Sequence, residues 1–71
     1  MIVGTIVNIY LDVNRFRVWV KFSNGSEEYF MFDDSVSVDE IKRVVQERVE
    51  YYNQLEQKEG ALKTELEGTE I

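Results

Sequence analysis

The sequence predicts a single α+β domain over residues 1–71, in which a three-stranded antiparallel meander (residues 1–34) precedes one long carboxyl-terminal helix. Three observations predict this β-β-β-α order. Apolar and polar residues alternate with a period of two through the first half of the chain. The apolar period becomes helical after Ser37. A helix-capping signal stands at the point of change. At this length a hydrophobic core is near the lower size that stabilises a fold alone, so oligomerisation is expected to contribute.

The first half of the chain contains three strand-like runs. The first run extends from Val3 to Val13 and the third from Glu28 to Phe32, which is rich in the aromatic residues that favour strands. In the second run, apolar residues alternate with Arg17, Trp19 and Lys21. The apolar positions of the first two runs are Val3, Val7, Ile9, Leu11 and Val13, and then Phe16, Val18, Val20 and Phe22.

The second hairpin is predicted to have a three-residue loop, Ser23-Asn24-Gly25, with Gly25 in the left-handed region. This loop keeps each face of the sheet chemically uniform, whereas a two-residue Asn24-Gly25 turn would move the aromatic residues of the third strand to the other face. The predicted pairs are Phe22 with Ser26, Lys21 with Glu27, Val20 with Glu28, Trp19 with Tyr29, and Val18 with Phe30.

The first hairpin is predicted to turn at Asn14-Arg15. That register pairs Leu11 with Val18, Ile9 with Val20, Val7 with Phe22, Asp12 with Arg17 and Tyr10 with Trp19. The two registers together predict one apolar inner face, made of Val7, Ile9, Leu11, Phe16, Val18, Val20, Phe22, Phe30 and Phe32.

The helical segment is predicted over residues 37–67. Ser37 and Glu40 form a capping box, Val36 and Ile41 stand where a hydrophobic staple would, and Asp39 lies favourably at the positive end of the helix dipole. An apolar stripe follows at helical spacing and is expected to cover the inner face of the sheet. The stripe consists of Ile41, Val44, Val45, Val49, Tyr52 and Leu55.

The stripe continues through Leu62 and Leu66, which leaves two alternatives for the end of the chain. One unbroken helix would be about 45 Å long and would extend past the sheet, so its last turns would need another surface. Gly60 costs a helix about 1 kcal/mol, so a break into a second short helix ending near Gly68 is the other alternative.

Composition argues against most enzyme classes. The chain has no cysteine and no histidine, which removes thiolate ligands, disulfides, the usual general base at neutral pH and the commonest nitrogen ligand of zinc. We therefore expect no catalytic, cofactor-binding or metal site and no small-molecule substrate. Cysteine usage fits a reducing compartment, and no signal peptide or membrane span is evident, so a cytoplasmic protein is expected.

The formal charge of −6 lies in residues 33–71, because the charges of residues 1–32 balance. This acidic half disfavours nucleic-acid and anionic-membrane binding. Its only local carboxylate cluster, Asp33 and Asp34 with Asp39 and Glu40, is explained by the strand end and the helix cap. Arg48, inside the apolar stripe, either forms an ion pair across an interface or extends its charged group into water along the core.

The outer face of the sheet is predicted to carry a row of aromatic residues, Tyr10, Trp19 and Tyr29, flanked by Arg17 and Lys21. Such a row can form a protein contact, support the sheet through cross-strand pairs, or stack nucleic-acid bases. Glu27 and Glu28 beside the row weaken the third interpretation.

The layout of the chain resembles that of short uncharacterised bacteriophage and prophage proteins over most of its length. The resemblance is carried by Phe22-Ser23-Asn24-Gly25-Ser26-Glu27, Phe32, the helix start at Ser37-Val38-Asp39-Glu40-Ile41, and the acidic end from Leu66 to Ile71. It implies a small accessory or structural role in a phage or prophage, and it carries over no site residue.

The hypothesis that follows is a non-enzymatic interaction or structural protein that self-associates or binds a protein partner. The alternative is a small module that binds single-stranded nucleic acid through the aromatic sheet face. The candidate partner-binding residues are Tyr10, Arg17, Trp19, Lys21, Tyr29, Leu55, Leu62 and Leu66.

Overall fold

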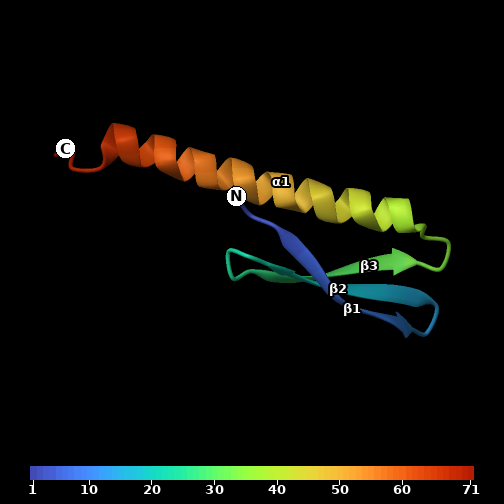
Figure 1. Cartoon of the computed structure of the whole chain (residues 1–71). Helices are drawn as coiled ribbons and strands as arrows, with labels where there is room; N and C mark the ends of the chain where they lie inside the picture. The colour runs from blue at the N-terminus through green and yellow to red at the C-terminus, as the bar shows by residue number, and fades with distance from the viewer.

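The computed structural model describes residues 1–71 and has the predicted α+β order. Strands β1 (Gly4–Asp12), β2 (Arg15–Phe22) and β3 (Glu27–Asp33) form one antiparallel sheet in the order β1-β2-β3, and helix α1 (Val38–Leu66) follows. Figure 1 shows α1 lying along one face of the sheet and continuing past it toward the carboxyl terminus. The three-stranded meander followed by one long helix is therefore confirmed.

The β2–β3 hairpin has the predicted register. Lys21 lies opposite Glu27 and Trp19 opposite Tyr29. Gly25 has a φ of 91°, in the left-handed region that glycine adopts without steric cost. The backbone N–H of Phe22 donates to the carbonyl of Ser26 at 2.8 Å and closes the loop.

The predicted register of the β1–β2 hairpin is wrong. The loop is the two-residue pair Val13-Asn14, so Leu11 lies opposite Phe16 and Ile9 opposite Val18, two residues away from the predicted partners. Val13 has a φ of 59°, which is unusual for a β-branched residue and gave no signal in the sequence.

A β-bulge at Val7 changes the faces of β1. Beyond it Ile6 lies opposite Val20 and Gly4 opposite Phe22, so Ile6 and Gly4 point to the helix side in place of the predicted Val7. A Cβ atom added to Gly4 would lie 3.1 Å from the Phe22 ring and 3.2 Å from a methyl group of Val49. Glycine at this position therefore lets α1 approach the start of β1 closely.

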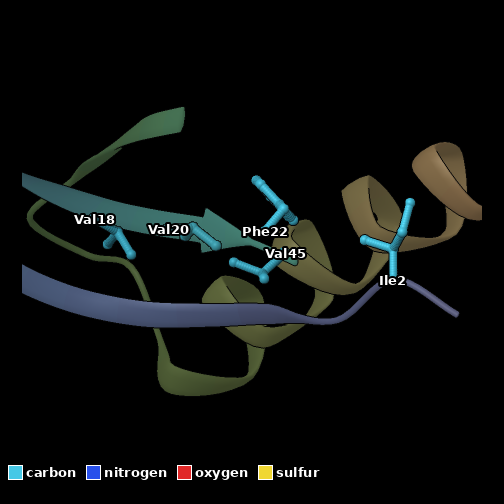
Figure 2. Close-up of a cluster of buried hydrophobic side chains, with 5 residues drawn as sticks. All are labelled: Ile2, Val18, Val20, Phe22 and Val45. Carbon is cyan, nitrogen blue, oxygen red and sulfur yellow. The ribbon is translucent and has the colours of Figure 1, made fainter. Parts of the chain in front are cut away.

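The core lies between β2 and the amino-terminal half of α1. Val18 and Val20 are fully buried, and Val45 of α1 belongs to the same cluster and lies beside Val20 and Phe22 (Figure 2). Around them lie partly buried residues of β3 and α1. The buried cluster is Ile2, Val18, Val20, Phe22 and Val45, and the side chains packed against it are Phe30, Phe32, Ile41, Val49 and Tyr52.

The prediction that α1 covers the whole inner face is wrong for β1. Ile9 and Leu11 point to the helix side of the sheet, yet they are 50% and 62% exposed. A helix is about 10 Å wide and neighbouring strands lie about 4.8 Å apart, so one helix covers about two strands. Here it covers β2 and part of β3, and the inner face of β1 beyond Gly4 stays open.

Helix α1 begins as predicted and runs unbroken through Gly60. The Ser37 hydroxyl accepts from the backbone N–H of Glu40 at 3.1 Å, which is the expected amino-terminal cap. Lys63 and Glu59 form an ion pair of 3.1 Å one turn apart, across Gly60. The helix ends at Leu66, and Gly68 follows with a φ of 84°. The alternative with a break at Gly60 is therefore not the one observed.

Candidate interaction surfaces

On the outer face of the sheet, Trp19 and Tyr29 form a stacked cross-strand pair. Their ring centroids are 5.8 Å apart and their planes differ by 10°. The Lys21 ammonium lies 4.9 Å from the centroid of the Trp19 ring, and the indole N–H of Trp19 donates to Glu27 at 3.1 Å. Trp19 is half-buried by these neighbours, so much of its ring is already used within the chain.

Tyr10 does not lie directly opposite Trp19, as the predicted register required. It lies opposite Arg17, and Asn8 takes the position opposite Trp19. The predicted partner of Arg17 across the strands, Asp12, is displaced in register but still reaches it: Arg17 Nε donates to Asp12 Oδ2 at 2.7 Å. This hydrogen bond raises the pKa of Arg17.

The charges on the outer face balance. The register places three basic and three acidic residues on this side, so it offers no positive patch for a phosphate backbone. The basic residues are Arg15, Arg17 and Lys21, and the acidic residues are Asp12, Glu27 and Asp33.

The carboxyl-terminal part of α1, from Leu55 to Leu66, extends past the sheet, and we call it the overhang (Figure 1). Leu55, Leu62 and Leu66 lie along one side of it and are 44%, 48% and 55% exposed. They line a shallow groove together with charged side chains. The other lining residues are Lys58, Glu59, Lys63 and Glu67.

A second groove lies where α1 meets β3, and we call it the β3 groove. It is formed by Phe30 of the strand and four residues of α1, and its apolar members are exposed or half-buried. The helix residues that line it are Val44, Glu47, Arg48 and Tyr51.

Arg48 has a partner within its own chain. Its Nε lies 3.4 Å from Glu28 Oε2, an acidic residue on the helix side of β3, and its guanidinium lies 5.5 Å from the Tyr51 ring centroid. The Tyr52 hydroxyl donates to the same Glu28 oxygen at 2.7 Å. This bond, with partial desolvation, raises the pKa of Tyr52. The cluster ties β3 to α1.

Sequence analysis missed a contact that fixes the amino-terminal segment. The N–H of Ile2 donates to Asn53 Oδ1 at 2.8 Å, and Asn53 Nδ2 donates to the carbonyl oxygens of Ile2 and Val49 at 3.2 and 3.1 Å. Ile2 is thereby buried against α1. The available signal was an asparagine beside the apolar stripe of a helix, where a polar side chain needs a partner.

Asp33, at the strand-to-helix junction, has a local role. Asp33 accepts from the backbone N–H and the hydroxyl of Ser35, at 3.1 and 2.7 Å, and so closes the turn after β3. No group of three potential ligands lies close enough to hold a metal ion. No helix combines the length and apolar character needed to cross a bilayer.

Comparisons with protein-family models, with curated proteins and with solved structures found no match to this chain.

Proposed function

We propose that this protein is a non-enzymatic interaction or structural protein that works by self-association. The observation that carries the proposal is the overhang, where a helix continues past the sheet with Leu55, Leu62 and Leu66 exposed along one side. A helix with an apolar side is stable in water mainly through what that side packs against. Within one chain, Leu55 still borders Ile2 and Tyr52, whereas Leu62 and Leu66 lie past the sheet (Figure 1).

The surface area supports the same proposal. The chain exposes 5600 Å², whereas a folded monomer of 8.4 kDa exposes about 4,600 Å². The excess of roughly 1,000 Å² is close to the ~800 Å² that each partner buries in a standard protein interface. One interface between two chains would therefore bring the exposed area to that of an ordinary folded protein.

We extend the proposal to a small cytoplasmic accessory or structural role of the kind that the phage-like layout implies. The absence of cysteine fits a reducing compartment. The proposal assigns no catalytic residue. Glu28, the carboxylate on the helix side of the sheet, has a structural role because it binds Tyr52 and Arg48.

Sedimentation of wild type and Leu62→Asp tests the proposal. We expect wild type to sediment as an oligomer at micromolar concentrations and Leu62→Asp to weaken association at least tenfold, because a carboxylate in an apolar contact costs more than ~1.4 kcal/mol. The matched control is Gln57→Asp, which places the same carboxylate on the opposite side of the overhang.

A wild-type chain that stays monomeric at high micromolar concentration would overturn the proposal. Equal weakening by Leu62→Asp and Gln57→Asp would show that charge alone, and not the apolar side of the overhang, is responsible.

The alternative function, single-stranded nucleic-acid binding through the outer sheet face, has less support. Trp19 already stacks on Tyr29, and the charges around the pair balance. Titrating oligonucleotides at ~50 mM salt while following Trp19 fluorescence tests it, because attraction to phosphates is strong at low salt. Saturable quenching would favour this alternative, and a flat titration would eliminate it.

A further inference from the structure

The exposed leucines of the overhang continue the same side of α1 that lines the β3 groove. Val44 and Tyr51 line the groove, and Leu55, Leu62 and Leu66 follow them at steps of four and seven residues, which keep side chains on one side of a helix. We call these five residues the seam. Its amino-terminal half lies beside the sheet, and its carboxyl-terminal half has only solvent beside it.

Leu55 lies at the midpoint of the seam, so the two halves of the seam have the same length. Val44 and Leu66 lie equally far from it along the helix, about three turns on either side. A two-fold axis near Leu55 would therefore place the overhang of one chain along the β3 groove of another, and Leu66 of one copy beside Val44 of the other.

We propose that the occupant of the β3 groove is the overhang of a second copy of this chain, in an antiparallel α1-to-α1 dimer with Leu55 at the two-fold axis. This arrangement rests on the self-association proposed above and specifies its partner surface. Each overhang gains an apolar groove lined by Phe30, Val44 and Tyr51, and each groove gains the leucines that fit it.

Charge selects the antiparallel direction. A parallel pair would set Arg48 against Arg48 and Glu59 against Glu59 of the second copy, and like charges at matched positions are unfavourable. The antiparallel pair brings Arg48 near Glu59 of the second copy and Arg43 near its Glu65. The helix dipoles also oppose each other favourably in this direction.

The acidic carboxyl-terminal part of the chain supports the same direction. In residues 56–71, five glutamates outnumber Lys58 and Lys63, and a parallel pair would hold these two acidic segments side by side. An antiparallel pair places the centres of the two segments about 25 Å apart along the helix, beyond the Debye length of about 8–10 Å. The acidic residues are Glu56, Glu59, Glu65, Glu67 and Glu70.

Single-cysteine variants test the arrangement cleanly because the natural chain has no cysteine. Under mild oxidation we expect Leu55→Cys to form a disulfide-linked dimer, because the two sulfurs would meet at the axis. Leu66→Cys alone should not exceed the background set by Gln57→Cys, on the opposite side of the helix. A mixture of Val44→Cys and Leu66→Cys should give the mixed dimer. Efficient self-linking of Leu66→Cys would overturn the proposal in favour of a parallel pair.

Distances between spin labels provide a second test that needs no disulfide. In the antiparallel dimer, labels at Lys42 of the two copies lie about 40 Å apart, whereas labels at Gln54 lie within roughly 20 Å. A parallel pair would give similar short distances at both positions. A dimer that fails both tests overturns this arrangement alone, whereas a chain that sediments as a monomer overturns the proposed function as well.

Discussion

Two glycines in this chain have different surroundings, so we expect their substitution by alanine to have opposite effects on the free energy of unfolding. A Cβ atom on Gly4 would lie 3.1 Å from the Phe22 ring and 3.2 Å from a methyl group of Val49, so these side chains would have to move, whereas a Cβ atom on Gly60 would meet nothing within 4 Å. Gly4 therefore permits a close packing contact that a larger residue would crowd. Gly60 is a helix-interior glycine that the fold tolerates at an entropic cost.

We predict that Gly60→Ala raises the free energy of unfolding by about 0.5–1 kcal/mol, because alanine lowers the backbone entropy of the unfolded chain. Gly4→Ala should lower it by about 1–3 kcal/mol, because the added methyl group overpacks the contact between β1 and α1. Urea unfolding at one fixed protein concentration measures both. Equal effects of the two substitutions would contradict the observed packing at Gly4.

The raised pKa of Tyr52 predicts how the free energy of unfolding changes at alkaline pH. Its hydrogen bond to Glu28 raises the pKa of the hydroxyl above the ordinary value of about 10. A raised pKa gives stability that is fully present below pH ~10 and is lost as the pH rises further, because the unfolded chain then releases its proton first.

Wild type should therefore lose stability above pH 10 more steeply than Tyr52→Phe, which lacks the hydroxyl and is less stable at neutral pH. The control is Tyr51→Phe, the next residue on the helix, which leaves the Tyr52 bond intact. Urea midpoints at pH 8 to 11 measure the difference. Parallel pH profiles for wild type and Tyr52→Phe would contradict the assigned bond.

At the scale of elements, the two hairpins differ in how well the residue at the left-handed position of the turn tolerates that conformation. Gly25 in the β2–β3 loop has a φ of 91°, which glycine adopts without strain. Val13 in the β1–β2 turn has a φ of 59°, where its Cβ atom meets the neighbouring carbonyl group. The pairing of β1 with β2 therefore stabilises the first hairpin, although Val13 disfavours the left-handed backbone conformation that the turn requires.

Val13→Gly should raise the free energy of unfolding by about 1 kcal/mol, because it relieves the left-handed conformation at a side chain that is almost fully exposed. Asn14→Gly is the matched control, since Asn14 does not have a positive φ, and it should not stabilise the protein. Thermal unfolding of the two variants measures the contrast. A gain for Asn14→Gly instead would show that the strained residue is misassigned.

At the scale of the whole molecule, the chain is more extended than a compact chain of its length. Its radius of gyration is 16.4 Å, whereas a compact chain of 71 residues has one of about 11 Å. The difference comes from α1, which runs along a molecule 55 Å long and 19 Å across. Only five side chains are buried, so the core within one chain is small.

A chain that relies on self-association unfolds at a temperature that depends on its concentration. We expect the Tm of wild type to rise by roughly 5 °C for each tenfold increase in concentration, from the usual entropy of unfolding per residue applied to a dimer. Leu62→Asp should show a lower Tm with little concentration dependence. Calorimetry over a hundredfold range of concentration tests this, and a constant Tm for wild type would contradict it.

Part of the candidate surface could be predicted from sequence, and part could not. The Trp19–Tyr29 pair and the exposed side of the overhang follow from strand alternation and helical spacing, which are local properties. The position of Tyr10 was wrong because the turn lies at Val13-Asn14 and not at the predicted Asn14-Arg15, which moves the partners of β1 by two residues. The contact between Ile2 and Asn53 joins residues far apart in the chain, so no local pattern specifies it.

By itself, the sequence determined the order of strands and helix, the Ser37 cap and the register of the β2–β3 hairpin. Each depends on hydrogen bonds and steric preferences among residues close together in the chain. Only the tertiary structure showed the register of β1, which follows from the left-handed Val13 and the bulge at Val7, and the continuity of α1 through Gly60. It also decided which strands the helix covers, because that depends on how closely Phe22 and Val49 approach Gly4 and on the width of one helix, which are relations between distant segments.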